Sequence, residues 1–439
     1  MKTVDLIVHA RWLIPVNTHH HVLEHHSVVV KGGQIVDIMP QDQAKQSYSA
    51  TLEQTFNEHC LMPGLINNHG HAAMSLLRGL ADDLPLMTWL NDHIWPAEKR
   101  WVSDTFVEAG SELAIAEMIR SGTTCFNDMY FFPDATARVV DQSGIRACLG
   151  MIVIEFPTAW AATVDEYLHK GQQLHDHYRH HSRITTAYAP HAPYTVSNDT
   201  IEAIIMNAEE LDVPIHMHIH ETAGEISQSI EQYGVRPLER LKQLGLLSPR
   251  LIAVHMTQLN EQEINWCAET GIHIAHCPES NLKLASGFSP IAKLEQHGIN
   301  ITIGTDSAAS NNDLDMFAEM RQTALLAKAV AQDASAIPAY RALEMATINA
   351  AKALGIDNIT GSLEIGKAAD MIAIDLGGIE TQPCYDVISK LVYATSRDKV
   401  TDVWVEGKHL LKDRQLTTLN PTKIIHNSQQ WADKIRLAN

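Results

Sequence analysis

The fold is decided by Leu61-Met-Pro-Gly-Leu-Ile-Asn-Asn-His69-Gly-His71, a short apolar run that ends in two histidines separated by one residue. Alternate residues of a β-strand lie on one face, and each residue rises about 3.3 Å along the strand. Both imidazoles can therefore face one ion at the end of a strand over residues 61–67. A His-x-His pair alone is weak evidence, because two surface histidines on an edge strand have the same spacing.

Seven more apolar segments follow, separated by helix-like stretches. The predicted strands cover residues 61–67, 124–129, 145–154, 184–189, 214–219, 251–255, 271–277 and 300–305, and the predicted helices include 103–120, 198–210 and 261–270. Nearly continuous apolar strands are typical of a parallel sheet that is covered on both faces. Eight strand–helix units predict an α/β fold, a (β/α)8 TIM barrel, whose sites form at the carboxyl ends of the strands. An open doubly wound sheet is the alternative, but no glycine-rich phosphate loop follows the first strand.

The two ends of the chain contain strand-like segments and turns without the alternating helices of the middle. Residues 1–60 contain short strands with turns, and Gly32-Gly33 suits a two-residue hairpin turn. Strand-like segments return after residue 370. We therefore expect a composite β-sandwich domain from residues 1–60 and 370–439, and a barrel domain from residues 61–369.

Composition excludes several classes of function. The formal net charge of −19 disfavours nucleic-acid binding, which needs clustered basic residues. No segment approaches the roughly 18 consecutive apolar residues of a membrane helix. The six cysteines form no C-x-x-C pair, and the first residues do not read as a secretory signal. We expect a cytoplasmic protein that acts on a small molecule and binds neither nucleic acid nor membrane.

The strand predicted at residues 214–219 ends in three histidines of one parity and an acid. His216, His218 and His220 share a face, so alternation alone cannot select a metal ligand among them. Position favours His218, which should reach the rim, whereas His216 should lie deeper as a hydrogen-bonded core residue. Glu221 could then stand beside a metal without binding it.

Two further strand ends carry groups of the same kind. His255 ends the sixth predicted strand, and Asp306 directly follows the eighth. Each alone would more often be a cap or a structural hydrogen bond, but polar groups at four strand ends point to a shared site. Imidazole nitrogens and a carboxylate oxygen suit a borderline ion such as Zn²⁺, which makes water reactive near neutral pH. The pattern predicts hydrolysis.

At this point the sequence resembles the amidohydrolase superfamily, in particular its zinc-dependent purine nucleoside deaminase branch. The segments that carry the resemblance, in order, are Pro63-Gly-Leu-Ile-Asn-Asn-His69-Gly-His71, His218-x-x-Glu221, His255 and Thr305-Asp306-Ser-Ala-Ala-Ser-Asn-Asn312. The strand-rich flanks match as well, so the resemblance covers nearly the whole chain.

The resemblance implies a role for each of these residues. The implied zinc ligands are His69, His71, His218 and Asp306. Glu221 corresponds to the proton shuttle that also contacts the substrate, and His255 to the residue that orients the attacking hydroxide, with Asp306 taking part in catalysis. Binuclear relatives carry a lysine at the end of the fourth strand, where this chain has Tyr188-Ala-Pro-His191-Ala-Pro-Tyr194. We therefore expect one zinc ion per subunit.

The substrate is a finer question. Residues 84–98 resemble the loop that closes over the nucleoside in 5′-methylthioadenosine/S-adenosylhomocysteine deaminases, in which a glutamate at the place of Glu98 binds the ribose hydroxyls. A histidine at the place of His191 contacts the nucleoside. Members that bind the homocysteine tail can carry an arginine after the third strand. Here Met151-Ile-Val-Ile-Glu155-Phe offers apolar groups and an acid, which favours the neutral thioether tail.

The expected reaction is hydrolytic deamination of 5′-methylthioadenosine to 5′-methylthioinosine and ammonia. The alternatives are deamination of adenosine or S-adenosylhomocysteine, of a free base such as guanine or a pterin, and hydrolysis of a triazine. A non-catalytic protein with a structural zinc is the alternative from another class, since four protein ligands close such a site. Glu221 favours catalysis, because a structural site needs no proton carrier. Assembly into a homo-oligomer is left open.

Overall fold

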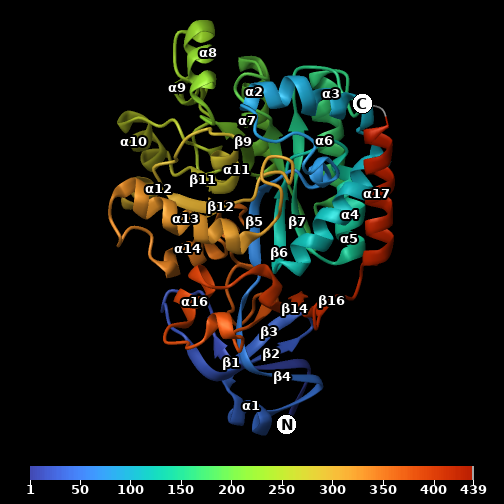
Figure 1. Ribbon diagram of the computed structural model, residues 1–439, viewed down its shortest axis with the longest axis vertical. Coiled ribbons are helices and arrows are strands. Elements are labelled where there is room, and N and C mark those ends of the chain that lie inside the picture. Colours follow the sequence, from blue (N-terminus) through green and yellow to red (C-terminus); the bar gives the residue numbers. More distant parts are fainter. Residues whose placement is uncertain (438–439) are drawn as a thin grey trace.

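The computed structural model describes residues 1–437 and places a barrel above a separate sheet (Figure 1). The barrel has eight parallel strands that neighbour one another in sequence order. They are β5 (Leu65–Gly70), β6 (Thr123–Asp128), β7 (Arg146–Val153), β8 (Ile184–Pro190), β9 (Ile215–Ile219), β10 (Leu251–His255), β11 (His273–His276) and β12 (Asn300–Ile303). The predicted TIM barrel is confirmed.

The first barrel strand begins later than the sequence predicted. Residues 61–63 form the end of β4 (Tyr48–Pro63), a strand of the other sheet. Gly64 then connects β4 to β5. A Cβ atom at Gly64 would lie 2.0 Å from Oγ1 of Thr124, so only glycine permits this close approach of the chain to β6. The predicted start of this strand at residue 61 was wrong, because one continuous apolar run contributes residues to two sheets.

Side chains complete the barrel between β12 and β5. The Thr305 backbone N–H donates to Oδ1 of Asn67 over 3.0 Å, and Nδ2 of Asn67 donates to the Thr305 hydroxyl over 2.7 Å. The Asp306 N–H donates to the His69 carbonyl over 3.0 Å. This closure places the carboxylate of Asp306 beside the imidazole of His69.

Most of the helices surround the barrel, whereas the helix at residues 41–47 packs against the separate sheet (Figure 1). The helices are α1 (Gln41–Ser47), α2 (Leu86–Trp89), α3 (Trp95–Trp101), α4 (Asp104–Arg120), α5 (Pro133–Ser143), α6 (Val164–Tyr178), α7 (Asn198–Leu211), α8 (Ala223–Tyr233), α9 (Pro237–Gln243), α10 (Glu261–Thr270), α11 (Pro278–Lys283), α12 (Ile291–Gln296), α13 (Met316–Ala331), α14 (Ala339–Met345), α15 (Ile348–Ala353), α16 (Val387–Tyr393) and α17 (Pro421–Arg436). The shorter helical turns are η1 (Ala72–Leu77), η2 (Leu90–Ile94), η3 (Ile379–Thr381) and η4 (Arg397–Lys399). None of the helices within residues 1–437 is both long enough and apolar enough to span a bilayer.

Side-chain caps explain why the predicted helices begin where they do. The Ser103 hydroxyl accepts from the Phe106 N–H at the start of α4. Asn260 and Glu263 form a reciprocal capping box at the start of α10. These caps satisfy backbone N–H groups that have no partner within the helix. The three helices predicted from residues 103, 198 and 261 are all present.

Both ends of the chain build one mixed sheet. Its strand order is β16-β15-β14-β13-β4-β1-β2-β3. The remaining strands are β1 (Lys2–Leu13), β2 (Leu23–Lys31), β3 (Gln34–Pro40), β13 (Met371–Asp375), β14 (Val400–Val405), β15 (Lys408–Lys412) and β16 (Gln415–Leu416). Gly32 and Gly33 turn between β2 and β3 with φ of +59° and +78°, which confirms the predicted hairpin.

The sheet and the barrel are joined by a buried ion pair and by the last helix. The Arg146 guanidinium at the start of β7 lies 2.9 Å from the carboxylate of Asp370, just before β13. Helix α17 returns from the sheet and packs Trp431 against Phe106 of α4, with ring centroids 5.2 Å apart (Figure 1). The division of the chain into domains at residues 60 and 370 stays a prediction.

Candidate active site

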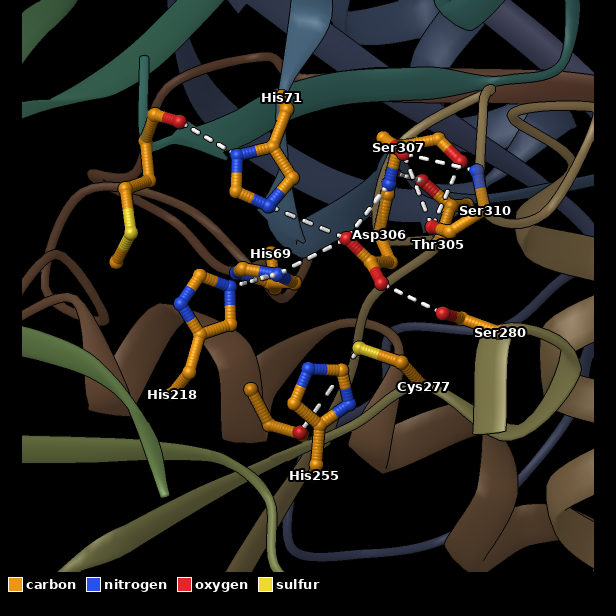
Figure 2. Close-up of polar contacts among 12 residues, drawn as sticks. His69, His71, His218, His255, Cys277, Ser280, Thr305, Asp306, Ser307 and Ser310 are labelled. Carbon is orange, nitrogen blue, oxygen red and sulfur yellow. Dashed lines mark hydrogen bonds and ion pairs between the residues drawn. The ribbon is translucent and has the colours of Figure 1, made fainter. Parts of the chain in front are cut away.

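The structure brings the predicted metal-site residues together at the carboxyl ends of the barrel strands (Figure 2). His69 lies in β5 and His71 directly follows it, His218 lies in β9, and His255 ends β10. Asp306 follows β12 with a φ of +60°, a strained conformation for a residue with a side chain. The side chains come from four separate strands and converge on one region.

The carboxylate of Asp306 lies at the centre of this group. Its Oδ1 atom is 3.3 Å from Nε2 of His69 and 3.2 Å from Nε2 of His71, and its Oδ2 accepts a 2.6 Å hydrogen bond from Ser280. The Nε2 atoms of His69 and His218 are 3.3 Å apart. Two groups of donor atoms lie within 4.8 Å of one another: those of His69, His218 and His255, and those of His69, His71 and Asp306.

Backbone carbonyl groups orient two of the imidazoles. Nδ1 of His71 lies 2.5 Å from the Met129 carbonyl, and Nδ1 of His218 lies 2.7 Å from the His191 carbonyl. A carbonyl can only accept, so each Nδ1 donates its proton there, and each Nε2 is the nitrogen left to face the centre of the site. Histidines that bind metals are held in this way by a hydrogen bond through the other ring nitrogen.

Side chains orient the other two imidazoles. Nδ1 of His69 lies 2.9 Å from Nε2 of His216, and Nδ1 of His255 lies 2.9 Å from Oδ1 of Asn281. The sequence predicted His216 as a buried, hydrogen-bonded histidine below His218, and the structure confirms that position. Its contact with His69 gives it a further role, because it fixes the ring that faces Asp306.

The donor set fits a metal ion. Burial lowers the pKa of His69 to about 4 and holds the pKa of His218 well below its usual range, so both rings are neutral. The Nε2 atoms of these two rings lie 3.3 Å apart, and Oδ1 of Asp306 lies 3.3 Å from Nε2 of His69. At His71 the contact with Asp306 outweighs burial and raises the pKa of the ring. Nitrogen and oxygen atoms at this spacing fit a borderline ion between them.

Glu221 stands next to these donors, and both sides of its peptide backbone are held. Its Oε2 lies 3.8 Å from Nε2 of His255. The Glu225 carboxylate accepts the N–H groups of His220 and Glu221 over 3.0 and 2.8 Å, and the Thr257 hydroxyl donates to the Glu221 carbonyl over 2.7 Å. Burial raises the pKa of Glu221. A carboxyl group with a raised pKa can accept and return a proton near neutral pH.

Of the metal-site residues, His71, His218, His255 and Asp306 line one pocket. The apolar side chains around it are Met74, Leu86, Trp89, Leu90, Ile94, Trp95, Met129, Phe131, Ile152, Ile154, Phe156 and Leu284. Among the described residues that line the pocket there is no lysine or arginine. The pocket therefore suits a flat, largely apolar ligand with few anionic groups.

Glu98 and His191, which the sequence placed near a nucleoside, both line this pocket. Glu98 lies in α3, and its Oε1 accepts a 2.7 Å hydrogen bond from the Tyr130 hydroxyl. Burial raises the pKa of Glu98 to about 7, although Tyr130 opposes this shift. His191 lies beside His218, with ring centroids 5.0 Å apart.

Glu155, the acidic residue that follows the third barrel strand, does not face the pocket, in contrast to the expectation from the sequence. Ile152, Ile154 and Phe156 line the pocket, whereas the Glu155 carboxylate accepts from the Ser197 N–H over 2.9 Å at the start of α7. The three pocket residues are separated by one residue each, so the alternation of β7 (Arg146–Val153) continues past its end and turns Glu155 away from the pocket. The wall at this place is apolar and carries no acid.

Several site residues were missed by sequence reasoning. These residues are Asp128 at the end of β6, Met129 and Tyr130 directly after it, Glu225 in α8, and Ser280 and Asn281 in α11. A signal existed for Asp128, because β6 ends in a polar pair after an apolar run, as other site strands do. Glu225 binds backbone groups four and five residues before it, whereas the other residues contact elements that are distant in sequence, for which no local pattern exists.

Comparison with known proteins agrees with this geometry. Residues 60–410 match the family described as Amidohydrolase family. A protein of Saccharophagus degradans named 5-methylthioadenosine/S-adenosylhomocysteine deaminase is 51% identical over 98% of this chain and 97% of its own. A protein of Teredinibacter turnerae with the same name is 49% identical over 99% and 98% of the two chains.

A solved structure is similar over the same length. The crystal structure of an adenosine deaminase from Xanthomonas campestris with bound zinc superposes with a TM-score of 0.98 at 50% identity, over 99% of both chains. The family match spans the whole barrel and its site, and the relatives match the chain nearly from end to end. This chain belongs to the amidohydrolase family.

Proposed function

We propose that the protein is a hydrolytic deaminase of adenine nucleosides, which converts 5′-methylthioadenosine and water into 5′-methylthioinosine and ammonia. The observation that carries this proposal is the placement of Glu221 beside a metal-binding group of histidines and Asp306, at one end of an apolar pocket. The names of the similar proteins, deaminases of this class of nucleoside, support it.

One zinc ion completes the site in this proposal, with His69, His71, His218 and Asp306 as its ligands. The ordered Nδ1 atoms and the bound zinc of the similar adenosine deaminase support this choice. A second ion would need a further bridging ligand, and the described segment after β8 offers no lysine. When bound, zinc lowers the pKa of water toward neutrality and so supplies hydroxide at physiological pH.

The protein's own residues move the protons. Glu221 takes a proton from the attacking water and delivers it to N1 of the adenine ring, while the water oxygen forms a bond to C6. His255, fixed by Asn281, orients the water through its Nε2. The O–H proton left on the added oxygen then moves, with the help of Asp306, to the amine at C6, the C–N bond breaks, and ammonia leaves with a carbonyl remaining at C6. Proton transfer by such a positioned group contributes about 10²–10⁴ in rate.

The other end of the pocket holds the sugar and its 5′ substituent. Glu98 accepts hydrogen bonds from the 2′ and 3′ hydroxyls of ribose, and His191 contacts the nucleoside. A carboxylate has acceptor sites for about four hydrogen bonds, so Glu98 can bind both hydroxyls while it keeps its bond to Tyr130. The apolar residues Ile152, Ile154 and Phe156 surround the 5′ substituent.

The proposed function is tested by comparing substrates that differ in the 5′ substituent or in the base. Ammonia release from 5′-methylthioadenosine, S-adenosylhomocysteine, adenosine, guanine and cytosine should be measured with zinc-loaded protein. We expect the highest kcat/KM for 5′-methylthioadenosine, because the pocket lining offers no cation for the carboxylate of the homocysteine tail. A clear preference for S-adenosylhomocysteine would refute the proposed tail, and activity on guanine alone would refute the nucleoside.

Removal of the sugar-binding carboxylate should act on nucleosides selectively. Glu98→Ala removes hydrogen bonds to a charged group worth about 1.5–3 kcal/mol each, so kcat/KM for 5′-methylthioadenosine should fall about 100-fold. Because the pKa of Glu98 is raised to about 7, kcat/KM should also fall as the pH drops below about 7 and this carboxylate takes up a proton. Glu108→Gln, at an exposed site on α4, is the control. Equal activity of Glu98→Ala and the wild type would show that Glu98 does not bind the sugar.

We also propose that the enzyme works in the cytoplasm. The six cysteines, all within the described residues, form no disulfide, which suits a reducing compartment.

A further inference from the structure

The segment Asp128-Met129-Tyr130 begins at the last residue of β6. Hydrogen bonds hold it against the end of β5 and the residues that follow β5. The Asp128 carboxylate accepts from the Ala72 N–H over 2.7 Å, and the Met129 N–H donates to the Gly70 carbonyl over 2.9 Å. The Met129 carbonyl in turn lies 2.5 Å from Nδ1 of His71. Three contacts thus fix this segment on the wall of the barrel, directly beside a candidate metal ligand.

Tyr130 extends from this fixed segment to the helix that carries Glu98. Its side chain is 3% exposed, and its hydroxyl donates to Oε1 of Glu98 over 2.7 Å. Helix α3 packs against the core through the partly buried side chains of Trp95, Ala97 and Trp101. The hydrogen bond from Tyr130 connects the acidic side chain of this helix to the fixed segment on the barrel wall.

We infer that Tyr130 is a positioning residue for the nucleoside sugar, an inference that rests on the proposed function. A glutamate side chain has three rotatable bonds and loses much conformational freedom when it is held by a ligand. The Tyr130 hydroxyl holds Glu98 in one arrangement before the substrate binds. The segment 128–130 therefore sets the position of the sugar-binding carboxylate relative to His71, and with it the distance from the ribose to the reacting carbon of the base.

Tyr130→Phe tests this inference because it removes the hydroxyl and keeps the ring. The two substrates are 5′-methylthioadenosine and its 2′,3′-dideoxy analogue, which lacks both hydroxyls that Glu98 would bind. For the variant we expect kcat/KM to fall about 10-fold or more on the first substrate, as for loss of a hydrogen bond to a charged group, mainly through KM. On the dideoxy analogue the variant and the wild type should differ less than about 2-fold, within the scatter expected when no interaction is lost.

A double mutant separates an effect through Glu98 from other effects. In a Glu98→Ala background, Tyr130→Phe should cause no further loss on 5′-methylthioadenosine, because the partner that it positions is absent. Tyr340→Phe is the matched control, since the Tyr340 hydroxyl donates to the Asn17 carbonyl over 3.2 Å outside the pocket. This control should leave kcat/KM unchanged on both substrates.

The outcomes distinguish the inference from the function on which it rests. Equal losses on the two substrates, or a further loss in the Glu98→Ala background, would show that Tyr130 acts on the fold or on the base, and would overturn the inference alone. Unchanged kcat/KM for Tyr130→Phe on 5′-methylthioadenosine would do the same. Wild-type protein that releases no ammonia from adenine nucleosides would overturn the proposed function together with the inference.

Discussion

Glu221→Gln is expected to lower kcat by about 10²–10⁴-fold while the protein keeps its metal. The amide has the shape of the carboxylate but cannot accept a proton from water and pass it to the base. Glu221 lies next to His255 at 3.8 Å and is held through its backbone by Glu225 and Thr257, so the substitution leaves the surrounding contacts in place. The loss should therefore appear in kcat and not in folding.

The measurement is the rate of ammonia release from 5′-methylthioadenosine at saturating concentration, together with the zinc content of the same sample. Glu231→Gln is the control, because Glu231 is an exposed residue of α8, the helix that follows Glu221. It should behave as the wild type. Near-normal turnover of Glu221→Gln with zinc bound would rule out Glu221 as the proton carrier.

Asp306→Asn is expected to give the second large effect, a loss of both metal and activity. The Oδ1 atom of Asp306 is the acceptor nearest to Nε2 of both His69 and His71, at 3.3 and 3.2 Å. The substitution removes the only anionic group among the four proposed ligands. Outer-shell partners of metal ligands already contribute about 10–100-fold to metal affinity, so a direct ligand should contribute at least that much.

Zinc affinity measured by competition with a chelator tests this expectation. Asp313→Asn alters a partly exposed carboxylate on the same segment and is the matched control. The control should bind zinc as the wild type does, whereas Asp306→Asn should bind it about 100-fold more weakly or not at all. Unchanged affinity of Asp306→Asn would remove Asp306 from the set of ligands.

The barrel could be predicted from the sequence because its signal is local. Each strand is an apolar run of ordinary length, and at β5, β9 and β12 a proposed metal ligand lies within the strand or no more than three residues after it. The choice of His218 over His216 depended on depth along the strand, since both side chains share one parity. The structure agrees, with His216 behind His69 and His218 facing it.

The parts that sequence could not supply depend on contacts between distant elements. Gly64 separates two sheets within one apolar run, and only the neighbouring Thr124 shows why the chain must turn there. Glu155 alternates with the pocket residues Ile154 and Phe156, but its actual partner, the Ser197 N–H at the start of α7, is 42 residues away. Tyr130 is 32 residues from Glu98, and their hydrogen bond exists only because α3 folds back over the barrel mouth.

X-ray diffraction at the zinc absorption edge, from crystals of zinc-loaded protein, tests the central claim most directly. That claim is that side chains from the ends of three separate strands, β5, β9 and β12, hold one metal ion at the end of the barrel. We predict one anomalous peak per chain, between Nε2 of His69, Nε2 of His71, Nε2 of His218 and the carboxylate of Asp306. A peak elsewhere, or an ion bound without these side chains, would contradict the account.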